Sequence, residues 1–202
     1  MKITSNGHSC FTLEADGFTL VTDPYEDGCL PGLPNLRLNA DAVISSHDHY
    51  DHNFLGAVTL SGRQCPFAIS TIHTFHDDTQ GSQRGENLIH IIEYGGVRVA
   101  HLGDLGHELS EEQLARLRGL DAIMIPVGGF YTIDAKTASS IADRIGAPVV
   151  IPMHYRHEGR GFKEIGELSD FLALRDDVVK SGKSIEITHG MNKQTAVVDF
   201  GG

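Results

Sequence analysis

The residues best suited to chemistry lie in one short segment, residues 47–52, whose pattern is His-x-His-x-Asp-His. Divalent zinc and similar borderline cations prefer neutral imidazole and carboxylate donors, and this segment offers both. The alternative is a solvated polar loop, or a single histidine that satisfies a buried backbone group. Three histidines so close together have no packing role, and buried imidazoles need partners, so the segment predicts a metal site.

Several rigid elements must converge on such a site. Polar side chains follow three predicted strands, directly or almost directly after their last apolar residues: His47 after residues 41–46, Asp104 after a hairpin over residues 88–102, and His154 after residues 149–151. Functional side chains often lie where a rigid element ends and a loop begins. The spacing therefore predicts that strand ends position the site.

The remaining elements are predicted from periodicity and turn residues. They are a hairpin around Asp16-Gly17, a proline-rich loop over 24–34, helices over 110–119, 134–146 and 164–179, and strands over 122–125, 184–188 and 195–200. Strands and hairpins come first and alternating strands and helices follow. This order predicts an α/β fold with sheets packed inside and helices outside.

Composition limits the size and the partners of the protein. The chain has 202 residues, of which 40% are hydrophobic, so we expect one domain over residues 1–202 with its own core. The formal net charge is −11, which disfavours a nucleic acid partner because phosphates repel an acidic surface.

Cysteine usage and hydropathy predict a cytoplasmic protein. Cys10, Cys29 and Cys65 are odd in number and form no Cys-x-x-Cys pair, so they are expected to be reduced thiols. No apolar signal segment or membrane-length apolar run is present, and no membrane partner is expected. The oligomeric state is open, and a homo-oligomer is compatible with the sequence.

Motifs along the chain resemble those of the metallo-β-lactamase superfamily, whose signature is His-x-His-x-Asp-His after a strand. Further segments resemble the ascorbate-phosphate-lactonase-like branch of zinc-dependent hydrolases. The segments that carry this resemblance are residues 7–11, 75–78, 84–87, 101–104, 126–129 and 151–155, in the order of the family. The resemblance implies an αββα sandwich of two mixed β-sheets flanked by helices.

The resemblance also implies a set of metal ligands. One metal would be held by His47, His49 and His76, and the other by Asp51, His52 and His154, with Asp104 bridging the two. His73 is an alternative to His76, because only 23 residues separate His52 from His76. Two Zn²⁺ ions per chain are expected, with Mn²⁺ or Fe²⁺ as alternatives.

The expected reaction is hydrolysis of a lactone, ester or phosphodiester in a small molecule, with a metal-bridging hydroxide as nucleophile. Asp51, Asp104 and His8 are the catalytic candidates. His8 would bind substrate or donate a proton, or else only hold a strand end together. Arg84 would pair with an anionic substrate group, or else make a surface salt bridge. Asp23 would orient a ligating imidazole, or else serve a turn.

Two other functions fit part of the pattern. One is a mononuclear iron-dependent oxidoreductase of the dioxygenase kind, because related sites in the superfamily bind iron. The other is a non-catalytic metal-binding protein. Seven ligands with a bridging carboxylate argue against a purely structural zinc, which usually has four ligands and no open position. The natural substrate is not determined by the ligand set.

Overall fold

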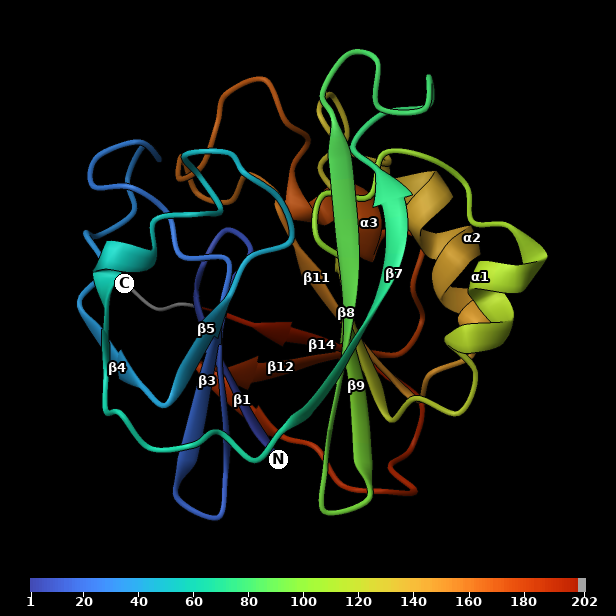
Figure 1. Cartoon of the computed structure of the whole chain (residues 1–202). Coiled ribbons are helices and arrows are strands. Elements are labelled where there is room, and N and C mark those ends of the chain that lie inside the picture. Colours follow the sequence, from blue (N-terminus) through green and yellow to red (C-terminus); the bar gives the residue numbers. More distant parts are fainter. Residues whose placement is uncertain (200–202) are drawn as a thin grey trace.

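The computed structural model describes residues 1–199 and contains two β-sheets packed face to face (Figure 1). The five-stranded sheet has the order β13-β1-β2-β3-β5 and the seven-stranded sheet the order β12-β14-β11-β10-β9-β8-β7. The first contains β1 (Lys2–Gly7), β2 (Cys10–Ala15), β3 (Phe18–Thr22), β5 (Ala42–Ile44) and β13 (Ser184–Glu186). The second contains β7 (Ala68–Phe75), β8 (Glu86–Tyr94), β9 (Val97–His101), β10 (Ala122–Pro126), β11 (Val149–Met153), β12 (Val178–Gly182) and β14 (Gln194–Val198).

Both sheets are mixed, as predicted. In the first, β3 and β5 are parallel and the other pairs are antiparallel. In the second, β7, β8 and β9 form an antiparallel meander, whereas β9, β10, β11, β14 and β12 are parallel neighbours. The structure thus confirms the sandwich of two mixed sheets.

Three helices and a small sheet cover the outer faces. The helices are α1 (Glu111–Arg116), α2 (Ala135–Ile145) and α3 (Leu168–Leu172). A 3-10 turn (Leu55–Ala57) and a small parallel sheet of β4 (Leu38–Ala40) and β6 (Val58–Leu60) lie beside the five-stranded sheet. No helix within residues 1–199 is long and apolar enough to cross a membrane.

Alternating side chains build three hydrophobic layers. Along β10, Met124 packs between the two sheets, whereas Ile123 packs under the helices. Along β3, Leu20 points between the sheets and Val21 points to the opposite face, which the small sheet and the loops cover. Every residue of β10 is buried, as expected for a central parallel strand covered on both faces.

Local signals in the sequence set the first two helices. The predicted capping box is present, because the Ser110 side chain accepts from the Gln113 N–H and the Gln113 side chain accepts from the Ser110 N–H. α2 begins after Asp134, which accepts from the Thr137 N–H, and it ends at Gly146, which has φ +73°. Both helices lie where the sequence predicted them.

The prediction of a long third helix over residues 164–179 is wrong. Only α3 (Leu168–Leu172) is helical, and Val178–Gly182 forms β12. The β-branched Val178 and Val179 pair with Thr195 and Ala196 of β14, where such side chains fit better than on a helix. The predicted last strand ends at Val198 in the structure, and its residue 200 lies outside the described residues.

The topology brings strand ends to one edge of the molecule. β9, β10 and β11 are parallel, so their carboxyl ends meet at the same edge of the sheet. β7 is antiparallel to β8, which is antiparallel to β9, so β7 ends at that edge too. The residues that directly follow these strands therefore lie close together.

Candidate metal centre

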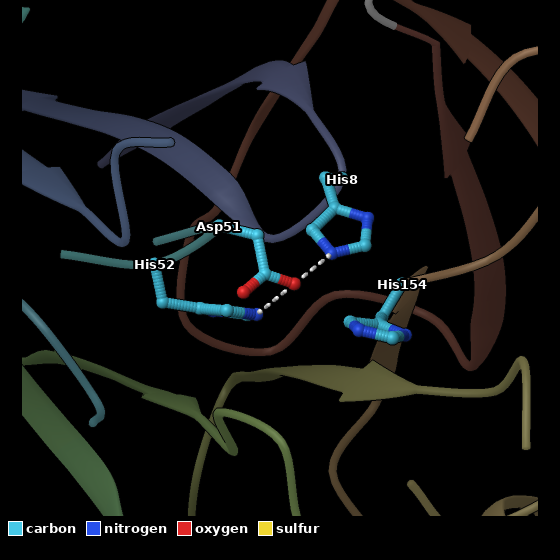
Figure 2. A group of neighbouring side chains, drawn as sticks. All are labelled: His8, Asp51, His52 and His154. Carbon is cyan, nitrogen blue, oxygen red and sulfur yellow. Dashed lines mark ion pairs between the residues drawn. The ribbon is translucent and has the colours of Figure 1, made fainter. Parts of the chain in front are cut away.

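Four buried side chains from three parts of the chain form one group of potential metal donors (Figure 2). They are His8, Asp51, His52 and His154, and one donor atom from each lies within 4.8 Å of the others. His8 lies in the turn between β1 and β2, Asp51 and His52 lie in the loop after β5, and His154 directly follows β11. We call this group the buried cluster.

A second group, the open cluster, consists of His47, His49 and His76, whose donor atoms also lie within 4.8 Å of one another. His47 and His49 are partly exposed, whereas His76 directly follows β7 and is buried. His73, the alternative third ligand, lies outside this group. Its side chain is 50% exposed, and its Nε2 atom lies 3.3 Å from Glu86 Oε1.

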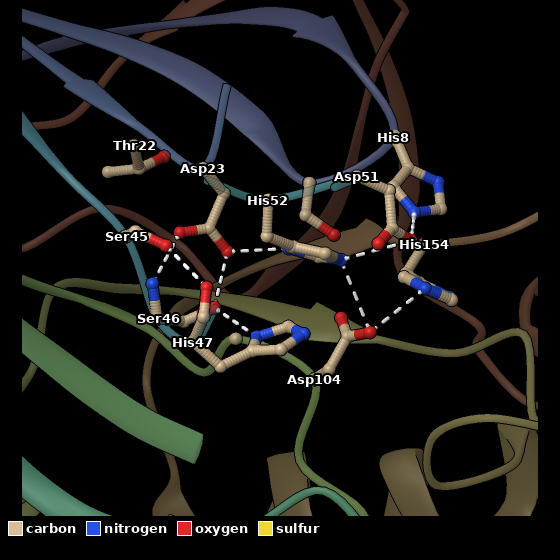
Figure 3. A network of polar contacts seen from close by, with 12 residues as sticks. His8, Thr22, Asp23, Ser45, Ser46, His47, Asp51, His52, Asp104 and His154 are labelled. Atoms are coloured by element: carbon tan, nitrogen blue, oxygen red, sulfur yellow. Dashed lines mark hydrogen bonds and ion pairs between the residues drawn. The ribbon is translucent and has the colours of Figure 1, made fainter. Parts of the chain in front are cut away.

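Asp104 lies between the two clusters (Figure 3). Its Oδ2 atom is 3.2 Å from His76 Nε2 in the open cluster, and 3.2 Å and 3.1 Å from His52 Nε2 and His154 Nε2 in the buried cluster. Donor atoms that share a tetrahedral cation at about 2.0–2.1 Å lie about 3.3 Å apart. Asp104 Oδ2 therefore has the spacing of an oxygen shared by both clusters.

A buried carboxylate behind the clusters determines which nitrogen of two histidines carries a proton (Figure 3). Asp23 Oδ2 lies 2.8 Å from His52 Nδ1; an ionised carboxylate only accepts, so Nδ1 holds a proton, and in the neutral ring Nε2 has the lone pair. Ser46 Oγ donates to Asp23 Oδ2 at 2.5 Å and lies 3.0 Å from His47 Nδ1. Since that hydroxyl has only one proton, His47 Nδ1 donates to it, and its Nε2 also keeps a lone pair.

Hydrogen bonds orient His76 and Asp104 in the same way. His76 Nδ1 lies 3.1 Å from the carbonyl oxygen of Tyr131, so the lone pair is on the Nε2 atom that faces Asp104. The Asp104 N–H donates to Asn87 Oδ1 at 2.9 Å. Gly103 has φ +57°, and a Cβ atom there would collide with Asn87, so glycine lets the chain pass this close.

Several polar atoms of the two clusters and of Asp104 are buried without hydrogen-bond partners among the described residues. These atoms are His8 Nδ1 and Nε2, His47 Nε2, His52 Nε2, Asp104 Oδ1, and His154 Nδ1 and Nε2. Burial without a partner costs free energy, and bound cations would remove that cost at the lone pairs. Nitrogen donors beside two carboxylates therefore fit a metal centre, and the donor types suit zinc.

The electrostatics of the site keep His8 and His47 neutral, favour a proton on His52 and keep the carboxylates charged. Burial lowers the pKa of His47 to about 3 and that of His8 to about 4, so both rings are neutral at pH 7. Burial opposes the charge of Asp104, but His154 and His52 outweigh it and lower the pKa of Asp104. Burial likewise opposes a charge on His52, but Asp104 raises the pKa of His52. A buried, ionised carboxylate thus attracts cations to the centre.

A pocket of about 230 Å³ opens in front of the clusters. It is lined by His49, Tyr50, Asp51, His76, Arg84, Asp104, Tyr131, His154 and Phe162. Five of these residues belong to the clusters or to the carboxylate between them, three are aromatic, and one is cationic. The pocket therefore gives a small molecule access to the candidate ligands.

Arg84 makes no ion pair with a carboxylate among residues 1–199, so the alternative of a surface salt bridge is wrong there. Its guanidinium donates to the Phe130 carbonyl at 3.2 Å and lies 5.8 Å from the centre of the Tyr131 ring. Its backbone N–H donates to Asp77 Oδ2 at 2.7 Å. The guanidinium thus lies at the pocket, and no carboxylate of residues 1–199 neutralises its positive charge.

The role of Asp77 was missed by sequence reasoning. This buried carboxylate accepts from the N–H groups of Thr79, Gly81, Gln83 and Arg84, so the loop from β7 to β8 folds around it. Thr79 two residues after Asp77 is typical of a turn in which an aspartate bonds its own backbone. That spacing could have predicted the local turn, but not its place beside the pocket.

The chain is similar to known proteins over most of its length. A model of the beta-lactamase superfamily domain matches residues 2–154. "UPF0173 metal-dependent hydrolase" proteins of Methanosphaerula palustris and Methanoculleus marisnigri are 29% and 30% identical, over 93% of this chain and 100% and 97% of their own. A solved structure from Thermotoga maritima, assigned to the Zn-dependent hydrolases of the metallo-beta-lactamase superfamily, is 34% identical with a TM-score of 0.75 over 97% of both chains.

The fold and the His-Asp clusters are thus those of a metal-dependent hydrolase. The chain belongs to the metallo-β-lactamase superfamily, and the relatives that match nearly its whole length are metal-dependent hydrolases. The family predicted from the His-x-His-x-Asp-His segment is therefore confirmed.

Proposed function

We propose that the protein is a binuclear, zinc-type hydrolase that cleaves a lactone, ester or phosphodiester bond in a small anionic molecule. The observation that carries this proposal is the position of Asp104 Oδ2, 3.1–3.2 Å from three histidine nitrogens that belong to two clusters. A lone structural zinc needs four donors in one group, and the seven predicted ligands exceed that need.

The ligands divide between two cations. His47, His49 and His76 would hold one, Asp51, His52 and His154 would hold the other, and Asp104 would contact both. When bound, such a pair lowers the pKa of water from 15.7 towards about 7 and stabilises negative charge on the departing oxygen.

The residues of the chain contribute orientation and charge balance. Asp23 and the Tyr131 carbonyl accept from Nδ1 of His52 and His76, so Nε2 is the atom of each ring that faces the cation, and a cation at His52 would displace the proton that Asp104 favours there. The ionised Asp104 balances part of the positive charge of the cations. These interactions are present before a substrate arrives, which reduces reorganisation during the reaction.

The pocket supports a small anionic substrate. Its volume of about 230 Å³ is below the range of about 300–1,000 Å³ typical of sites for drug-sized ligands. Tyr50, Tyr131 and Phe162 offer apolar surface, and Arg84 can donate to a carboxylate or phosphate. A net charge of −11 and three free cysteines support a cytoplasmic enzyme without a nucleic acid partner.

The test combines metal content with turnover. The metal-loaded protein is assayed against a panel of lactones, esters, phosphodiesters, thioesters and β-lactams, and its metal is quantified by mass spectrometry. We expect two cations per chain and hydrolysis of an anionic lactone, ester or phosphodiester. His49→Ala should lose a cation and the hydrolysis, whereas His73→Ala, which removes an exposed histidine of β7, should lose neither. Wild-type turnover by His49→Ala would refute the proposal.

A further inference from the structure

We propose that His8 is a protein ligand of the cation in the buried cluster. This cluster then offers five side chains, counting Asp104, whereas the open cluster offers four. The inference rests on the proposed binuclear site and adds a ligand to it. The cation in the buried cluster would then be five-coordinate, and the cation in the open cluster would have one protein ligand fewer.

The first observation is the spacing of donor atoms. His8 Nε2 lies 3.4 Å from Asp51 Oδ2, and His52 Nε2 lies 3.6 Å from the same oxygen (Figure 2). Neighbouring donors around a five-coordinate cation at about 2.0–2.1 Å lie about 2.9–3.6 Å apart. The distance from His8 Nε2 to Asp51 Oδ2 is therefore that expected between two ligands of one cation, as is the distance from His52 Nε2.

The second observation is that the buried His8 ring has few polar neighbours. Its side chain is fully buried, its Nδ1 atom has no hydrogen-bond partner among the described residues, and its Nε2 atom has only the long 3.4 Å contact with Asp51 Oδ2. His101, an equally buried histidine outside the clusters, differs: its Nε2 lies 2.8 Å from the Ser9 carbonyl oxygen and its Nδ1 accepts from the Gly103 N–H. A histidine that only holds a strand end together would resemble His101.

The third observation is the backbone that aims the ring. His8 and His154 both have left-handed backbones, with φ +56° and +52°, which is uncommon for residues other than glycine. The His154 N–H donates to the His8 carbonyl at 3.2 Å, and the two ring centroids are 4.1 Å apart. Strain of this kind persists where the surrounding structure fixes a functional geometry. It brings His8 to the ligand His154.

The pocket argues against His8 as a substrate binder or proton donor. The residues that line the pocket in front of the clusters include Asp51 and His154 but not His8. A proton donor must come within hydrogen-bond reach of the substrate. His8 faces the donors of the buried cluster instead.

The first experiment compares zinc affinities by titration against a chromophoric chelator. His8→Asn is the best variant, because asparagine tolerates a left-handed backbone and alanine does not. Loss of a residue that only hydrogen-bonds to a metal ligand weakens metal affinity about 10- to 100-fold. We therefore expect the affinity of His8→Asn for its tighter-bound zinc to fall by more than about 100-fold. The weaker zinc should be unchanged, and both should be unchanged in His73→Asn. Wild-type affinities for both zinc ions in His8→Asn would overturn the inference.

The second experiment needs no variant and decides the matter if His8→Asn does not fold. A crystal structure of the zinc-loaded wild type, with zinc located by anomalous scattering, should place a His8 nitrogen about 2.0–2.1 Å from the zinc in the buried cluster. A ring nitrogen beyond bonding distance would overturn the inference while leaving the binuclear site intact. A wild type that binds fewer than two zinc ions would instead refute the proposed function.

Discussion

The two clusters share Asp104 but differ in depth and in origin. All four side chains of the buried cluster are buried, whereas two of the three histidines of the open cluster are partly exposed. The buried cluster joins the turn after β1 to the residue after β11, so it links both sheets. The open cluster is nearer to solvent, although both clusters reach the pocket, through His49 and His76 on one side and Asp51 and His154 on the other.

The difference in burial between the two clusters explains how one site could both hold a cation and react. Deep, numerous donors favour tight binding, while partial exposure lets water and substrate exchange. Because the buried cluster collects residues far apart in the chain, its side chains meet only in the folded protein, so a cation bound there would contribute to folding stability.

The largest effect is expected from Asp104→Asn, which changes the residue that both clusters share. The amide is neutral, so the charge that balances both cations is lost. We expect kcat/KM for hydrolysis to fall by at least about 1000-fold, since such charge stabilisation is worth several kcal/mol.

The matched control for Asp104→Asn is Asp121→Asn, a buried carboxylate outside both clusters that accepts from the Arg98 N–H. Its kcat/KM should stay near that of the wild type even if its melting temperature falls. Equal losses in both variants would mean that the loss reflects damage to the fold rather than to a shared ligand.

A smaller effect is expected from Arg84→Gln, which removes the cationic side chain of the pocket in front of both clusters. Hydrogen bonds to charged groups are worth about 1.5–3 kcal/mol, so KM for an anionic substrate should rise about 10-fold or more. KM for a neutral analogue should not change. Arg118→Gln serves as the control, because Arg118 is exposed and outside the pocket. An equal rise for neutral and anionic substrates would contradict an anion-binding role.

The smallest effect is expected at Asp41, which lies at the opposite end of β5 from His47. Hydrogen bonds from Arg63 and Ser61 lower the pKa of Asp41 to about 2. A carboxyl whose pKa is lower in the folded state stabilises the fold above its unfolded pKa of about 4, and this contribution is lost as the pH falls towards 2.

Asp41→Asn should therefore lower the melting temperature at pH 7. The difference in melting temperature between the variant and the wild type should become smaller as the pH falls from about 4 to 2. Metal content should not change, which separates a structural carboxylate from those of the clusters. If the difference in melting temperature does not change with pH, the ion pair with Arg63 is not the cause of the difference.

The parts of the site that follow local rules could be predicted from sequence. His47, His49, Asp51 and His52 lie within six residues, and chemistry alone marks them as donors. His8 could not be assigned, because its neighbours Asp51 and His154 lie far away in the sequence. Distance in sequence hides such contacts until the topology is known.

The same reason explains the successes and failures in the fold. The helix after Asp134 carries its own cap and stop signals, so it was predicted correctly. β7 (Ala68–Phe75) was missed because it is a mostly exposed edge strand without a clean apolar alternation. Val178–Gly182 is a strand only because β14 lies beside it, and no local signal reveals that partner.

The most direct test of the central claim is electron paramagnetic resonance of the protein loaded with Mn²⁺. If Asp104 bridges two cations a few ångströms apart, saturation should require two Mn²⁺ per chain and the spectrum should show spin coupling between them, which Asp104→Asn should abolish or weaken. Saturation by one Mn²⁺, or two Mn²⁺ without coupling, would contradict the claim that the two clusters form one centre.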